Sequence, residues 1–66
     1  MINIDDIIKI NRKEFKGLKF RVISIISQDE VVAVTTDKNN KIIKTKVKIE
    51  ELDIIKKSKR INIDFG

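Results

Sequence analysis

The acidic side chains of this chain are its candidates for acid–base catalysis, but their spacing is poor for that role. The paired candidates are Asp5 with Asp6 and Glu50 with Glu51, and further candidates are Asp29, Asp37, Asp53 and Asp64. Neighbouring residues point to opposite faces of a strand, or about 100° apart on a helix, so such pairs do not form an acid–base couple. We therefore expect these residues to occupy turns and the start of a helix.

The chain also contains no histidine and no cysteine. Imidazole acid–base catalysis, thiol nucleophiles and the common zinc sites all require those residues. Glycine-rich phosphate loops are missing too, since the two glycines are Gly17 and Gly66. The sequence thus predicts a protein that is not an enzyme, with no cofactor and no metal site.

Basic side chains are better candidates for binding, and they form two groups. The first lies on an expected loop and its exits: Arg12, Lys13, Lys16, Lys19 and Arg21. The second is a stripe of alternate residues about 7 Å apart on one strand, comparable with the phosphate repeat of a nucleic acid: Lys44, Lys46 and Lys48. Alternatively, both groups are solvated surfaces, with the lysines protecting a strand edge from pairing.

Charge and aromatic content indicate what such a surface would bind. A formal charge of +5 and a pI near 9.7 favour acidic partners, nucleic acid first, although a charge of this size also suits ordinary solubility. The three phenylalanines, without tyrosine or tryptophan, leave little for stacking bases or binding proline-rich peptides. We expect contacts mainly to backbone phosphates, with weak sequence specificity.

Alternation of apolar and polar residues predicts the elements that position these groups. The segment Ile8-Lys9-Ile10 alternates, and so does the segment from Ile43 to Ile49, whose apolar side chains would share one face while the three lysines share the other. Between them we expect two more strands. In the first, Phe20, Val22 and Ile25 would face inward, with a bulge near Ile23; the second runs from Glu30 to Thr36. Turns are expected at residues 27–29 and 37–40.

The two ends of the chain leave alternatives open. Residues 49–52 fit one helical turn followed by a fifth short strand, but a longer helix over residues 49–60 also fits. Asn3 would cap a helix if the chain began with one. The preferred prediction is an all-β fold over residues 1–57, a small five-stranded barrel like that of Src-homology-3 domains. Residues 58–66 would form a tail or an extra strand.

The first half of the chain, roughly residues 5–36, resembles the KOW-type module of ribosomal proteins and transcription elongation factors. It contains the strand Asp6-Ile7-Ile8-Lys9-Ile10, the loop Phe15-Lys16-Gly17 and the start of a valine strand at Arg21-Val22. The resemblance implies a small barrel that acts in a ribonucleoprotein or transcription complex. Phe20 stands where the family has a second glycine, which changes the expected loop geometry.

The sequence supports two main functional hypotheses. The first is a small basic module that binds RNA, DNA or a ribonucleoprotein or transcription complex through the basic loop, assisted by the lysine stripe. The second is a protein-interaction module, such as an accessory or inhibitory protein of a phage or mobile element, docking on an acidic partner. A structural subunit assembling through strand edges is a third. No apolar run is long enough for a membrane span, so we expect a cytoplasmic protein with no membrane partner.

Overall fold

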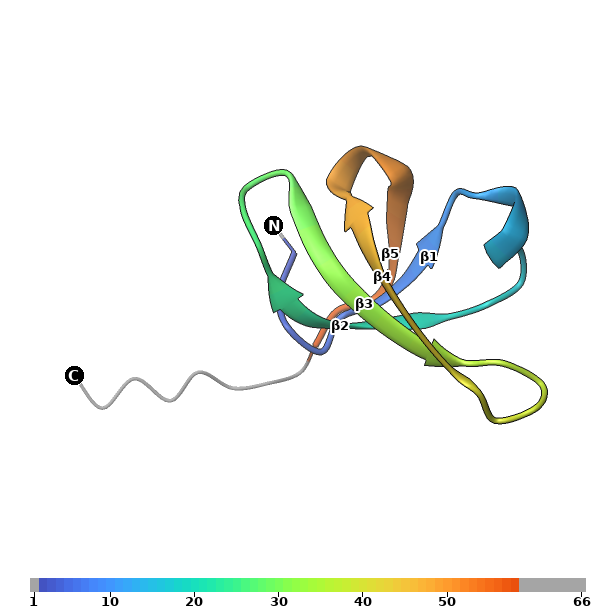
Figure 1. The fold of residues 1–66 in the computed structure, drawn as a ribbon. Helices are drawn as coiled ribbons and strands as arrows, with labels where there is room; N and C mark the ends of the chain where they lie inside the picture. The colour runs from blue at the N-terminus through green and yellow to red at the C-terminus, as the bar shows by residue number, and fades with distance from the viewer. Residues whose placement is uncertain (1, 59–66) are drawn as a thin grey trace, which may run out of the picture.

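The computed structural model describes residues 2–58 as one antiparallel sheet (Figure 1). Its strands are β1 (Ile7–Ile10), β2 (Phe20–Ile25), β3 (Glu30–Thr36), β4 (Ile42–Lys48) and β5 (Leu52–Lys56). Two single 3-10 turns interrupt them, η1 (Lys13–Phe15) and η2 (Ile49–Glu51). The predicted all-β class, the five strands and the helical turn near residues 49–52 are therefore confirmed. No helix in the described part of the chain is long and apolar enough to cross a membrane.

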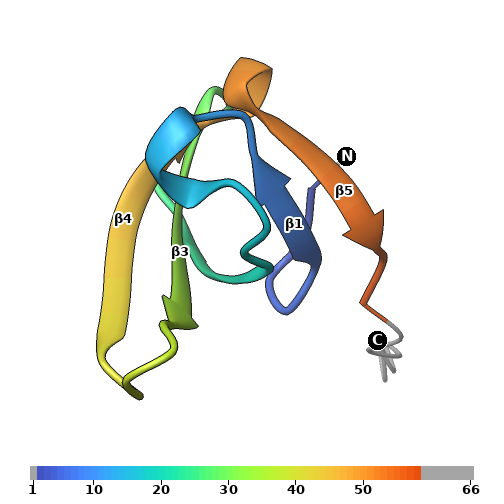
Figure 2. The same ribbon diagram turned by 90° about the vertical axis from the view of Figure 1, so that its right-hand side faces the viewer.

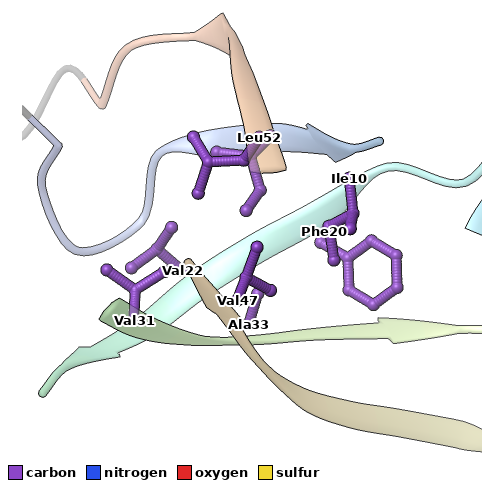
Figure 3. Close-up of a cluster of buried hydrophobic side chains, with 8 residues drawn as sticks. Ile10, Phe20, Val22, Val31, Ala33, Val47 and Leu52 are labelled. Carbon is purple, nitrogen blue, oxygen red and sulfur yellow. The ribbon is translucent and has the colours of Figure 1, made fainter. Parts of the chain in front are cut away.

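The sheet curls around a small apolar core. Its strand order is β4-β3-β2-β1-β5, and η2 carries the chain from one edge strand to the other (Figures 1 and 2). Inward side chains from all five strands fill the interior (Figure 3): Ile8, Ile10, Phe20, Val22, Val31, Ala33, Val47 and Leu52. Phe15 packs against this core with its ring edge-on to Phe20, centroids 5.1 Å apart. The result is a barrel-like fold.

The alternation of β2 ends where a bulge was predicted. Phe20 and Val22 are fully buried, and the register with β3 shifts between Val22 and Ser24. Ile25, however, is 45% exposed, so the prediction that it joins the core is wrong. The bulge changes the direction of the side chains that follow it. Ile25 therefore lines a surface hollow with Ile2 and Ile49 instead of joining the core.

The two predicted hairpin turns are present. Asp37 Oδ1 accepts hydrogen bonds from the backbone N–H groups of Asn39 (2.8 Å) and Lys41 (2.9 Å), and Asn40 has a positive φ of 62°. In the other turn, Ser27 Oγ accepts from the N–H of Asp29. Along β4 the apolar side is half-buried or buried and the lysines are exposed, as the alternation predicted.

Both helical alternatives are wrong for the described residues. The N–H of Ile49 donates to the carbonyl of Asp29 at 2.8 Å, and residues from Leu52 onward pair with β1, so no longer helix forms there. At the other end Asn3 caps no helix; its segment is a tight turn in which Asp5 has a φ of 74°. The predicted tail or extra strand over 58–66 lies outside the described residues, apart from Ser58.

Asp6 is the buried polar group that ties the two ends of the described chain together. Its carboxylate is fully buried and accepts hydrogen bonds from Lys57 Nζ (2.8 Å) and from the backbone N–H groups of Ser58 (2.7 Å) and Asn3 (2.8 Å). Burial by itself raises the pKa of Asp6, but these donors outweigh it and hold the pKa below its ordinary value. The sequence analysis placed Asp6 in an ordinary turn and missed this role.

The Asp6→Asn variant should lower the free energy of unfolding at pH 7 by about 2 kcal/mol. The substitution replaces the charged carboxylate, which accepts three hydrogen bonds in a buried site, with a neutral amide. A lowered folded-state pKa means that the carboxylate stabilises the fold above its unfolded pKa of about 3.9, and that this is lost as the pH falls through the folded value. Urea unfolding from pH 7 to pH 2 measures both effects. The exposed Asp29→Asn variant is the control; equal pH profiles for Asp6→Asn and the native protein would contradict the prediction.

Candidate functional site

The eight basic residues predicted to bind, in a loop group and a strand stripe, are grouped differently in the folded chain. The structure places them in three settings: Arg12 in an ion pair, Lys13 and Lys16 in the β1–β2 loop, and the remainder on the outer face of β2–β4. Seven of the side chains are exposed, and Arg12 is half-buried. Because the neighbours differ, the side chains of each setting can make different contacts with a ligand.

Arg12 is held by the protein itself. Its Nε and Nη2 donate to Glu51 Oε2 and Oε1, both at 3.0 Å, and Nη2 also donates to the carbonyl of Lys46 at 3.0 Å. The guanidinium carbon lies 5.8 Å from the centroid of the Phe15 ring. The hydrogen bonds between Arg12 and Glu51 raise the pKa of Arg12 and, together with the N–H of Lys48, lower the pKa of Glu51. Arg12 therefore fastens the loop to β4 and η2, and Glu51 balances its charge.

The outer face of β2–β4 gathers basic residues that are distant in sequence. Arg21 pairs in register with Val34, and Val34 pairs with Lys44. Directly paired residues point to the same face, and neighbouring strands lie about 4.8 Å apart, so the Cα atoms of Arg21 and Lys44 lie about 10 Å apart across Val34. Lys46 follows Lys44 on the same face.

Lys19 extends this face at the start of β2. Its carbonyl accepts a hydrogen bond from Thr35 Oγ1 at 2.6 Å, which fixes it beside β3. Lys19 and Arg21 both line an open hollow of about 380 Å³, together with Ile42 at the start of β4. We call the set Lys19, Arg21, Lys44 and Lys46 the basic face.

The last lysine of the stripe has a different electrostatic setting. Lys48 stands opposite Glu30 in the pairing of β4 with β3, so the two opposite charges offset each other at that end of the strand. The positive field of the stripe is therefore strongest around Lys44 and Lys46, near Arg21.

The loop lysines line a second hollow of about 330 Å³. Lys13 and Lys16 are joined there by Lys9 of β1 and by Gly17, whose φ of 83° is a conformation that glycine adopts without strain. Sequence analysis placed Lys9 outward on its strand but did not include it in the site, because Lys9 and the loop lysines meet only when the loop folds back. Ile42, 74% exposed beside the basic face, was likewise missed as a surface residue.

The comparisons with known proteins give no relative from which to transfer a role: no family model, no curated protein and no solved structure matches this chain. What the site can bind therefore follows from its own residues. The basic face presents lysine amines and one guanidinium, with a few apolar side chains between them. Such a surface holds anionic groups without covalent chemistry.

The Arg12→Gln variant should be less stable than the native protein, because Glu51 and the carbonyl of Lys46 lose their donor. We expect the thermal midpoint to fall by a few degrees and hydrogen exchange at the Lys48 amide, which donates to Glu51, to accelerate. Lys13→Gln removes the same charge from the same loop and should leave stability within about 0.5 kcal/mol. Equal losses in both variants would show that only net charge matters.

Proposed function

We propose that this protein is a small, non-catalytic module that binds nucleic acid through backbone phosphates, using the basic face. The observation that carries the proposal is the cross-strand row from Arg21 through Val34 to Lys44. It joins a residue of the predicted loop group to the predicted stripe on one exposed surface. A surface of clustered cations on a basic protein is the electrostatic footprint of a phosphate-binding module.

The spacing of the cations supports phosphate contact. Lys44 and Lys46 are alternate residues of β4, about 7 Å apart along the strand, which is about twice the 3.4 Å rise per phosphate of one nucleic-acid strand. Arg21 offers a planar guanidinium suited to phosphate oxygens. The lysines that line the second hollow, namely Lys9, Lys13 and Lys16, supply a second set of contacts.

The KOW-type resemblance supports the same proposal at the level of the family. The Lys16-Gly17 loop lies between two strands, and Gly17 has the positive φ that a glycine at this point permits. Phe20, at the position of the second family glycine, is fully buried in the core here. On this proposal the module contacts RNA, DNA or a ribonucleoprotein or transcription complex, with contacts that follow charge more than sequence.

A second candidate function, docking on an acidic protein, is favoured by the apolar surface. Large apolar side chains are at least 37% exposed at Ile4, Ile23, Ile25, Ile26, Ile42, Ile54 and Ile55. Ile42 lies beside the basic face, so one partner would meet cations and an apolar residue together. Apolar side chains rimmed by polar groups are typical of protein interaction sites, and Ile42 with its neighbouring cations has that composition.

Fluorescence anisotropy with generic duplex DNA, single-stranded DNA and RNA tests the leading proposal. For about four phosphate contacts, log affinity should fall with log salt with a slope of about −3.5 on duplex DNA. Arg21→Gln/Lys44→Gln should weaken binding at least about tenfold and reduce the slope by about 2. The control is Lys38→Gln, because Lys38 is exposed in the turn at residues 37–40 and lies outside the cross-strand row.

Two results would overturn nucleic-acid binding through the basic face. One is the lack of any binding at low salt to all three nucleic acids. The other is an equal loss of affinity per charge removed in the double variant and in the Lys38→Gln control. If nucleic acid fails while Ile42→Ser abolishes capture of an acidic protein from nuclease-treated lysate, the second candidate function is supported.

A further inference from the structure

Strand β4 is an edge of the sheet, and two hydrogen bonds to side chains show which of its backbone groups point away from β3. Backbone groups of successive residues in an antiparallel strand point alternately toward and away from the neighbouring strand. The carbonyl of Lys46 accepts from Arg12, and the N–H of Lys48 donates to Glu51 Oε1 at 3.2 Å. Both partners lie outside β3, so the even-numbered residues of β4 direct their backbone groups to the free side.

The Arg12–Glu51 ion pair closes only one part of this edge. It satisfies the carbonyl of Lys46 and the N–H of Lys48. Within residues 2–58 no strand other than β3 pairs with β4, and the backbone groups of Ile42 and Lys44 and the N–H of Lys46 face the free side. Figure 2 shows β4 at the rim of the sheet, with its hairpin end extending beyond the core. An edge about five residues long is therefore available.

We propose that this edge, from Ile42 to Lys46, binds an extended acidic peptide segment of a partner protein, which adds to the sheet as a sixth strand. The backbone groups of the edge supply the hydrogen bonds, as in other cases of strand addition. This inference rests on the edge of β4 and its backbone, whereas the proposed nucleic-acid function rests on the outward face.

The side chains beside the edge specify the chemistry of the segment. Ile42, Lys44 and Lys46 are all exposed and all point to the outer face, because alternate residues of a strand share a face. Residues of an added strand would stand about 5 Å from them. The best segment thus carries Asp or Glu at two alternate positions, opposite the lysines, and an apolar residue two positions further, opposite Ile42.

A second copy of this chain fits the same edge poorly. Antiparallel pairing of two β4 edges about Lys44 would place Lys44 opposite Lys44 of the other copy, and each Lys46 opposite Ile42. Like charges directly opposite destabilise a pair of strands, and edge lysines are a common protection against self-association. Charge complementarity therefore favours an acidic partner segment over a homodimer.

The probes are two end-blocked peptides, Glu-Thr-Glu-Thr-Ile for an antiparallel and Ile-Thr-Glu-Thr-Glu for a parallel addition. NMR titration of the native protein with each peptide should shift the amides of Lys44 and Lys46 and slow their hydrogen exchange. The matched control peptide carries N-methyl groups on its backbone and keeps every side chain. Equal affinity of a probe and its N-methylated form, or protection confined to the β1–β2 loop, would overturn the proposal.

Two variants of Lys44 separate the edge from the face. Lys44→Pro removes the outward N–H and the charge, whereas Lys44→Gln removes only the charge; proline is tolerated where an edge N–H faces solvent. Peptide affinity should be about tenfold lower in Lys44→Pro than in Lys44→Gln, while nucleic-acid affinity should fall equally in both. Equal peptide affinities in the two folded variants would contradict strand addition. If Lys44→Pro does not fold, the N-methylated probes decide.

Discussion

The bidentate ion pair between Arg12 and Glu51 determines how the surface of this small protein is organised. It joins the start of the β1–β2 loop to η2 and to the edge of β4, and it reinforces the backbone hydrogen bond from the N–H of Asn11 to the carbonyl of Glu51. An ion pair with about 30% of each side chain exposed contributes modestly to stability. Its geometric effect is larger, because it fastens the loop to η2 and closes one part of an open sheet edge.

A second constraint is the size of the core. Among residues 2–58, only Ile8 and Ile10 of the many isoleucines belong to the buried cluster, while seven others remain at least 37% exposed. A domain of this length has too little interior to bury them all. The small core also explains the role of Asp6. Only Leu52 of β5 is buried, so the hydrogen bonds of Asp6 with Lys57 and Ser58 hold the segment that follows β5. Surface isoleucines thus lie beside cations, and the exposed surface is amphipathic.

The basic face and the β4 edge make use of the same strand in two ways. Side chains of Lys44 and Lys46 give the face its charge, and the backbone of the same residues gives the edge its free hydrogen-bonding groups. A strand with lysines on an open edge resists self-pairing yet remains available to a partner of opposite charge. On the two proposals above, phosphates and an acidic strand would compete for these lysines.

The sequence by itself determined the strands, because period-two alternation at Ile8-Lys9-Ile10 and from Ile43 to Ile49 is a local property that packing preserved. It also determined the hairpin at Asp37–Lys41, whose side-chain bonds are local. Only the tertiary structure decided which charges meet. Long-range contacts paired Arg12 with Glu51, brought Lys9 to the loop lysines, buried Asp6 beneath Lys57 and left Ile25 outside the core. Each depends on register and chain reversal between distant segments, which residue spacing does not encode.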